Sequence, residues 1–93
     1  MANKFNPGQI VVTQGVAKRM QEDQDFRRFV DSSFKRHLAG DWGDLSQEDK
    51  QENEFSLKEG FRILSSYENS NTKIWIITEA DRSVTTILFP EEY

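Results

Sequence analysis

The chain of 93 residues contains no cysteine, and this absence removes several kinds of chemistry at once. Disulfide bonds, thiolate metal ligands and cysteine nucleophiles are all excluded. Its apolar runs are short, so we find neither a helix that could cross a membrane nor an apolar signal core at the start. We therefore expect a single domain over residues 1–93 that stays in the cytoplasm and does not bind membranes.

Positive charge is scarce relative to negative charge. Lys and Arg number 12 against 16 Asp and Glu, which gives a formal net charge of −4 at pH 7. Nonspecific nucleic-acid binding is not expected, because phosphate groups attract a positive footprint. Basic residues dominate 18–36 and acidic residues dominate 41–59. This segregation favours two solvated helix faces and leaves a partner surface open as the alternative.

Aromatic residues are well represented, with seven Phe, two Trp and two Tyr, and they favour a packed core over disorder. Apolar residues recur at spacings of three and four over 25–38, which predicts a helix with one buried face. A second helix is predicted over 47–59, with Ser46 as its N-cap and Gly60 at its end. Residues 16–22 predict a shorter helix, for which Thr13 is the N-cap.

The last third of the sequence has the composition of a sheet. Segments 61–68, 73–79 and 84–89 are rich in Ile, Trp, Tyr, Thr and Val, and short turns separate them. Short turns predict an antiparallel three-stranded meander. A further short strand is predicted at 9–12. The predicted fold class is α+β, in which an N-terminal short strand and two or three helices pack on one face of the C-terminal meander.

The predicted register divides the meander between two faces. A four-residue loop in the first hairpin and a two-residue loop in the second determine which alternate residues share a face. The face expected to meet the helices carries Ile63, Tyr67, Ile74, Ile76, Ile87 and Phe89. The opposite face carries Leu64, Trp75, Ile77, Val84 and Leu88, together with Arg62 and Glu79. Because this second face is half apolar, we expect the N-terminal segment or a homodimer contact to cover it.

A polar stripe on the acidic 47–59 helix is the strongest candidate for a site. Leu45, Asp49, Asn53 and Leu57 step by four, so Asp49 and Asn53 are expected to point toward the body of the protein. Buried polar groups need partners. In a structural interpretation, Asp49 caps its helix, Asn53 ties down the loop around Trp42, and Trp42 plugs the core with its N–H bonded to a carbonyl. In a functional one, the three residues enclose a polar pocket.

The only histidine suggests an enzymatic alternative. His37 is the one side chain that titrates near neutral pH without perturbation, so it is the available general base. Asp41 and Asp44 suit turn and cap positions, and they could instead hold a divalent cation through their oxygens. A small hydrolase or nuclease-like enzyme would combine these three residues. The sequence has no glycine-rich phosphate loop, zinc motif or serine elbow, so no resident metal and no cofactor are expected.

A second polar cluster lies at the turn of the last hairpin. Arg62 is expected to face Glu79 across the strands as an ion pair, with Asp81 and Arg82 in the turn. These residues suit a well-formed hairpin. Alternatively, the guanidinium groups of Arg62 and Arg82 could bind an anion.

The residues from His37 onward form a distinctive string. It runs His37-Leu-Ala-Gly40-Asp41-Trp42-Gly43-Asp44-Leu45, then Ile74-Trp75-Ile76-Ile77-Thr78-Glu79-Ala80-Asp81-Arg82-Ser83, and ends with Pro90-Glu91-Glu92-Tyr93. In this string the chain resembles a family of small uncharacterised proteins of plasmids and other bacterial mobile elements. Some members are labelled plasmid-related protein or type I restriction endonuclease subunit M. The resemblance implies a mobile-element setting in a bacterium and carries no assigned activity.

The restriction-subunit label does not fit this chain. A methyltransferase binds a cofactor and flips a base into a pocket, which needs a much larger body. The chain also lacks an Asn-Pro-Pro-aromatic motif. The main functional expectation is therefore a non-enzymatic binding or modulator module. It would bind a host or element-encoded protein, for instance in a defence or DNA-processing complex, through the Trp42 loop and the Asp81–Arg82 hairpin.

Overall fold

The computed structural model describes residues 3–93 and has an α+β fold, as the sequence predicts. Its elements are β1 (Gln9–Val12), α1 (Gln14–Glu22), α2 (Gln24–Leu38), α3 (Gln47–Glu59), β2 (Ile63–Asn69), β3 (Thr72–Thr78), β4 (Val84–Leu88) and the short 3-10 helix η1 (Pro90–Glu92). The strands form one mixed sheet in the order β1-β4-β3-β2. The β2–β3–β4 part is the predicted antiparallel meander, and β1 adds to it parallel to β4.

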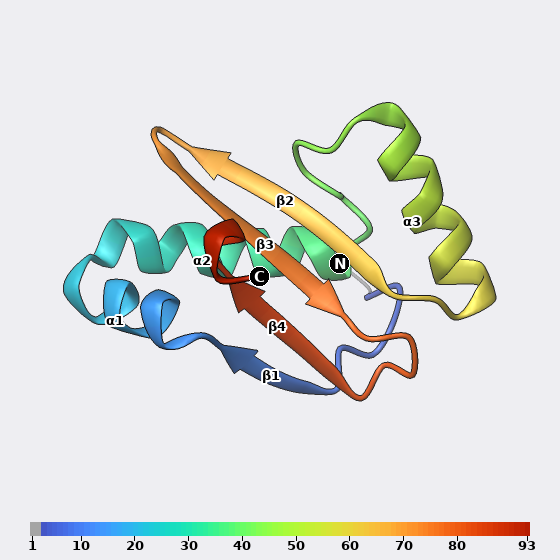
Figure 1. Ribbon diagram of the computed structural model, residues 1–93, viewed down its shortest axis with the longest axis horizontal. Coiled ribbons are helices and arrows are strands. Elements are labelled where there is room, and N and C mark those ends of the chain that lie inside the picture. Colours follow the sequence, from blue (N-terminus) through green and yellow to red (C-terminus); the bar gives the residue numbers. More distant parts are fainter. Residues whose placement is uncertain (1–2) are drawn as a thin grey trace.

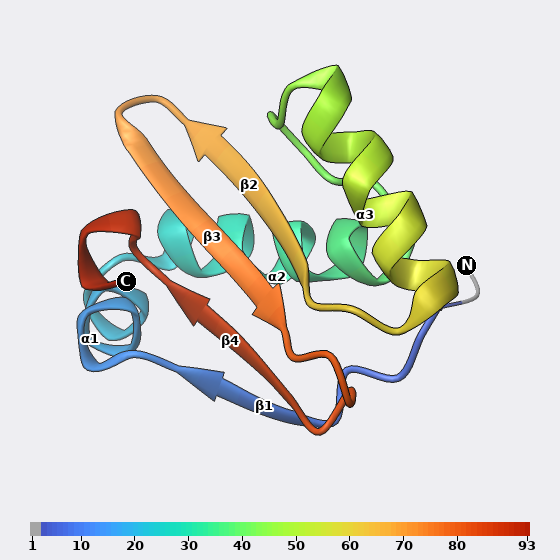
Figure 2. The ribbon, with the colours of Figure 1, turned by 45° about the vertical axis from the view of Figure 1, so that its right-hand side comes forward.

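The helices lie on one side and at one end of the sheet. Figure 1 shows α2 running behind the strands and α3 beside β2. In Figure 2, α1 lies at the left, beyond the end of the strands, and does not cover the side of the sheet that faces the viewer. No helix among residues 3–93 has both the length and the apolar character needed to span a membrane.

Side-chain caps define where the helices begin. Thr13 accepts a hydrogen bond from the N–H of Val16, and Ser46 accepts one from the N–H of Asp49, as the predicted caps require. Asp23 caps α2, so the chain breaks between α1 and α2 at this residue. Gly60 ends α3 with φ 82°, a left-handed conformation that glycine adopts without a steric cost.

The observed strand register matches the predicted one, although both predicted loop lengths are wrong. The first ladder continues until Asn69 lies opposite Thr72, which leaves two residues in the loop instead of four. The second ladder stops at Thr78 opposite Thr85, and a bond from Glu79 N–H to the Val84 carbonyl (3.0 Å) closes a loop over 80–83. Each loop changes by one residue on both strands, so every side chain keeps its face.

The sheet face that meets α1 and α2 forms the core. It carries the predicted residues, and Ile63, Tyr67, Ile74 and Ile76 are completely buried there. The helices contribute Val16, Phe26 and Val30, while Phe29 and Phe34 of the predicted apolar stripe are only partly buried. Full burial of each large apolar side chain contributes roughly 1.5–3 kcal/mol, so this layer is the main stabilising element.

The opposite face of the sheet has no helical layer, and we call it the open face. The prediction that the N-terminal segment covers it is wrong. Lys4 N–H donates to the Leu38 carbonyl (2.8 Å), and the Phe5 ring contacts the rings of His37 and Trp42, so this segment lies on the helix side. Of residues 3–93, only η1 and the residue after it extend over the open face (Figure 1).

Candidate functional site

His37 lies at the centre of a buried chain of polar side chains. Its ring has no exposed surface, with Nδ1 2.5 Å from Ser65 Oγ and Nε2 2.9 Å from Thr78 Oγ1. Thr78 Oγ1 is in turn 2.7 Å from Thr85 Oγ1, and the Thr85 hydroxyl donates to the Pro7 carbonyl at 2.7 Å. The chain thus joins α2, three strands and the segment that leads into β1.

The end of this chain determines the tautomer of His37. The Pro7 carbonyl only accepts, so it takes the single proton of Thr85. Thr78 must then donate to Thr85 and accept from His37 Nε2–H, which leaves Nδ1 to accept from Ser65. A neutral ring therefore satisfies the whole chain. Burial lowers the pKa of His37 to about 3, which keeps the ring neutral at pH 7.

The structure does not bring His37, Asp41 and Asp44 together. The Asp41 carboxylate accepts two hydrogen bonds from Arg36 (2.7 and 3.1 Å), and these hold the pKa of Asp41 below its usual value. Asp44 Oδ2 accepts from the N–H of Glu68 at 2.8 Å. Across residues 3–93, no group of three or more His, Asp or Glu side chains is placed to hold a metal ion. The three residues have separate structural roles.

Trp42 is a core plug, as one of the two interpretations predicts, but its partner differs. The side chain is 3% exposed and stacks on Phe5 at a ring-centroid distance of 6.4 Å. Its Nε1–H donates to a carboxylate oxygen of Glu54 (2.6 Å), and not to a carbonyl. The expectation that Asn53 ties down the Trp42 loop is therefore wrong, because the neighbouring Glu54 does so.

The polar stripe on α3 does not enclose a pocket with Trp42. Asn53 is buried, and its amide bonds both backbone groups of Leu64, donating to the carbonyl at 2.6 Å and accepting from the N–H at 3.3 Å. Asp49 is exposed, so the prediction that it points inward is wrong. Asn53 consequently provides hydrogen-bond partners for backbone groups at the outer edge of β2.

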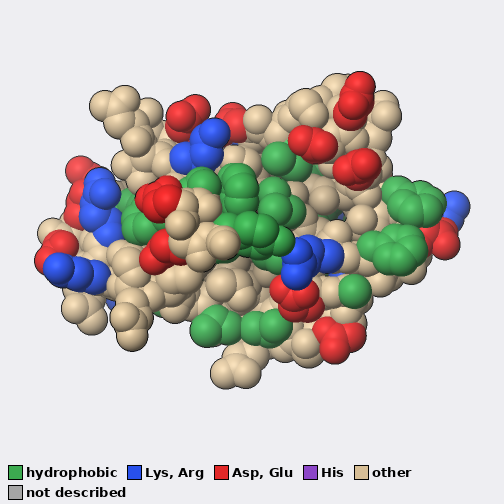
Figure 3. Space-filling model, in the orientation of Figure 1, with side chains coloured by type: hydrophobic (Ala, Val, Ile, Leu, Met, Phe, Trp, Pro, Cys, Tyr) green, Lys and Arg blue, Asp and Glu red, His purple; other side chains and the backbone are tan. Residues whose placement is uncertain are grey.

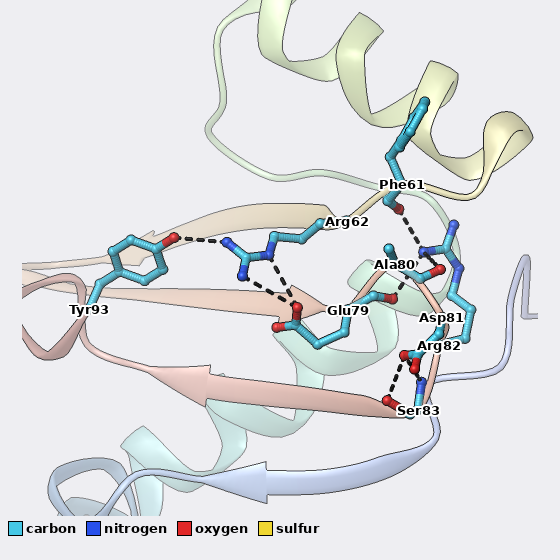
Figure 4. A network of polar contacts seen from close by, with 8 residues as sticks. All are labelled: Phe61, Arg62, Glu79, Ala80, Asp81, Arg82, Ser83 and Tyr93. Carbon is cyan, nitrogen blue, oxygen red and sulfur yellow. Dashed lines mark hydrogen bonds and ion pairs between the residues drawn. The ribbon is translucent and has the colours of Figure 1, made fainter.

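The Asp81–Arg82 turn clamps the hairpin to α3. Arg82 has φ 61°, which is uncommon for a residue with a side chain. Its guanidinium donates to the carbonyl of Ser56 at 3.0 Å. It also donates to the carbonyls of Phe61 (2.7 Å), Glu79 and Ala80 (Figure 4). A cation is favoured at the carbonyl end of a helix such as α3. Asp81 Oδ1 accepts from both N–H and hydroxyl of Ser83. These contacts direct Nη1 and Nη2 of Arg82 toward backbone carbonyls, so the turn has a structural role.

The predicted ion pair between Arg62 and Glu79 is present, at 3.3 Å. Arg62 Nη1 also donates to the hydroxyl of Tyr93 at 2.8 Å (Figure 4). The Tyr93 ring contacts the half-buried Trp75 edge-on, with centroids 5.7 Å apart. The ion pair therefore holds an aromatic ring over the middle of the open face.

Apolar side chains gather on the open face. Figure 3 shows them over the middle of the sheet, with both acidic and basic side chains around them. Tyr93 is 69% exposed and Trp75 is half-buried, while Ile77 and Leu88, on the same sheet face, are buried at 4% and 5% exposure. Exposed aromatic surface above buried apolar residues is a candidate interaction site. We call Trp75, Ile77, Leu88 and Tyr93 the aromatic patch.

A second exposed aromatic pair lies where α3 joins β2. Phe55 and Phe61 stack with centroids 5.8 Å apart and are 59% and 52% exposed. Neither ring, nor that of Tyr93, is among the site residues predicted from the sequence. Phe55 carried a signal, because it is an aromatic residue outside the apolar stripe of an acidic helix. The partners of His37 carried one too, since Ser65, Thr78 and Thr85 are polar residues on the sheet face predicted to be buried.

Comparison of the chain with protein-family models, with curated proteins and with solved structures gives no match. The resemblance to small mobile-element proteins therefore stays a prediction.

Proposed function

We propose that this protein is a non-enzymatic module that binds another protein through the open face of its sheet. The observation that supports the proposal is the aromatic patch, which lies on the one sheet face without a helical layer. Tyrosine, tryptophan and arginine are the residues most enriched among those that dominate binding energy at interfaces. Here Tyr93 contacts both Arg62 and Trp75.

The charges around the patch indicate the chemistry of the partner. Glu79 lies beside it and Glu91 and Glu92 are on η1, while Arg62 and Lys73 are the basic residues of the same sheet face. Such a surface suits a partner with an apolar centre and a basic rim, because complementary potentials speed and orient association. A basic rim is typical of proteins that hold DNA. Together with the mobile-element resemblance, this favours a host or element-encoded protein of a DNA-processing or defence complex.

The enzymatic alternative has less support. A general base must reach the proton that it removes. The ring of His37 is completely buried and both its nitrogens have partners, while Asp41 and Asp44 bind other groups. The binding surface predicted from the sequence, around Trp42 and the 81–82 turn, likewise makes internal contacts. The open face is the better candidate.

Site-specific photo-crosslinking tests the proposal. A benzophenone amino acid replaces Tyr93 in one variant and the exposed Gln24 of α2, on the helix side, in the control. In bacterial lysate, a discrete crosslinked protein is expected from position 93 and not from position 24. Equal crosslinking from both positions, or none from position 93, would count against the open face.

The crosslinked protein then allows a quantitative test with purified components. Tyr93→Ala is expected to weaken binding by about thirtyfold or more, because truncating a central aromatic anchor costs about 2 kcal/mol. Gln24→Ala should leave the affinity unchanged. An unchanged affinity for Tyr93→Ala would reject the patch as the binding site.

A further inference from the structure

The outer edge of β1 carries backbone groups without a strand partner. Gln9 N–H donates to the Ser83 carbonyl (3.0 Å) and Thr13 N–H to the Ile87 carbonyl (3.1 Å). The groups of odd-numbered residues therefore face β4, and alternation along the strand turns those of Ile10 and Val12 outward. In Figures 1 and 2, β1 lies at the margin of the fold and no described element lies beyond it.

The side chains of β1 suit pairing with another strand. Ile10 and Val11 are 44% and 40% exposed, which is high for large apolar residues. The segment from Gln9 to Thr13 contains no charged residue and no proline. Proteins usually guard an open edge with a short strand, lysine, proline, a bulge or a covering segment, and apart from its length of four residues β1 has none of these.

We propose that β1 pairs in antiparallel fashion with β1 of a second copy of this chain. The two-fold axis is perpendicular to the sheet and passes beside Val11. Antiparallel strands bond through pairs of residues that exchange both N–H···O contacts. Val11 then lies opposite Val11 of the second copy. Ile10 of each copy lies opposite Val12 of the other, and each of these two pairs exchanges both N–H···O contacts. Every outward N–H and carbonyl of Ile10 and Val12 is therefore bonded.

This register also matches the two faces of the sheet. Ile10 and Val12 lie on the same face as Thr85 and Ile87, and Val11 lies on the open face with Thr86. A two-fold axis perpendicular to the sheet keeps these faces continuous across the dimer. β-branched side chains then lie opposite β-branched side chains, and such cross-strand pairs stabilise a sheet. The segment is thus complementary to itself, which favours a second copy over an unrelated strand.

The dimer has a consequence for binding. Both open faces lie on one side of the joined sheet, so two aromatic patches are presented together. A strand of four residues spans only about 13 Å, and the contact is correspondingly small. We therefore expect a dimer that dissociates on dilution, as small interfaces do.

Charge-swap variants at Val11 test the strand pairing. Sedimentation velocity of the full chain, from micromolar to millimolar concentration, should show a monomer–dimer equilibrium. Val11→Lys and Val11→Glu each place like charges opposite one another and should raise the dissociation constant at least roughly tenfold. An equimolar mixture of the two variants should recover dimers, because the charges are then opposite. Circular dichroism verifies that each variant keeps the fold.

Tyr93→Lys is the matched control, because it adds the same charge on the open face away from the edge. It should leave the dissociation constant unchanged. A chain that is monomeric at all concentrations would overturn the proposal. So would a mixture of the two Val11 variants that stays monomeric, or a dimer that Tyr93→Lys disrupts while Val11→Lys does not.

Discussion

The two edges of the sheet differ: the β2 edge has hydrogen-bond partners for its backbone, and the β1 edge does not. At the β2 edge, Leu64 pairs with the Asn53 amide, Ser66 bonds Trp42 and Asp44 backbone groups, and the N–H of Glu68 donates to the Asp44 carboxylate. At the β1 edge, no described element lies beyond the strand, and the outward N–H and carbonyl groups of Ile10 and Val12 have no partner among residues 3–93. The difference shows that this chain can close an edge with side chains and a loop alone, which makes the open β1 edge a feature to explain.

The closed edge accounts for much of the Gly-Asp-Trp-Gly-Asp segment. Asp41 anchors the loop to Arg36, Trp42 fills the core, and Asp44 pairs with β2. Gly43 bridges to Ser66 with φ 76°. A Cβ at this position would lie 2.0 Å from the Ser66 carbonyl oxygen, so only glycine lets the loop approach the strand. The motif thus has a structural explanation in which catalysis plays no part.

Gly43→Ala is expected to have the largest effect on the closed edge. The substitution combines a left-handed backbone with a clash against backbone atoms, so we expect a loss of about 4 kcal/mol in the free energy of unfolding. Gly60→Ala is the matched control: its φ is 82°, but a Cβ would have no atom within 4 Å. That variant should lose only about 1 kcal/mol in urea unfolding. Equal losses in the two variants would contradict the close approach at Gly43.

Acid should destabilise the fold through His37, the centre of the buried hydrogen-bonded side chains. His37 has a folded pKa of about 3 against an ordinary value of 6.5. Between these values the unfolded chain binds a proton that the folded chain does not, so stability falls as pH falls. The free energy of unfolding should drop by roughly 3 kcal/mol between pH 7 and pH 4 through this residue. Carboxylates such as Asp41 add to the loss at the acid end, since their folded pKa values are lowered.

His37→Gln isolates the contribution of the ring. The amide cannot titrate, so the variant should be less stable at pH 7 and should lose the part of the pH dependence between pH 6.5 and 4.5. The comparison is made by urea unfolding across this range for both proteins. Parallel pH profiles would show that the ring is already accessible to protons in the folded state.

Asn53→Ala should open the β2 edge by a smaller amount. It leaves the N–H and carbonyl of Leu64 without their partner, and an unsatisfied buried group costs about 1–3 kcal/mol. Asp49→Ala, on the same helix but exposed, should change stability by less than about 0.5 kcal/mol. If the two alanine variants are equally stable, Asn53 does not close the edge.

The sequence was sufficient for what depends on local chemistry and alternation. The caps at Thr13, Ser46 and Gly60, the strand register and the two faces of the meander were all predicted. The face assignment is robust because it depends only on odd or even spacing, which the wrong loop lengths preserved.

Local chemistry and alternation do not determine how elements that are distant in the sequence pack against one another. A spacing of four places Asp49 and Asn53 on one stripe, but the orientation of α3 against β2 decides which residues turn inward. The same orientation puts Glu54, instead of Asn53, beside Trp42. The parallel pairing of β1 with β4 joins segments far apart in sequence and has no local signal. For the same reason, the sequence offered three separate site residues where the structure has one buried histidine and two engaged carboxylates.

Hydrogen exchange of individual amides tests the contrast between the two edges most directly. In dilute solution, the amides of Leu64, Ser66 and Glu68 should be protected, while those of Ile10 and Val12 should exchange quickly. Raising the concentration should slow Ile10 and Val12 and leave the β2 amides unchanged. Protection of Ile10 and Val12 at the highest dilution, or no response to concentration, would contradict an open edge that a second copy completes.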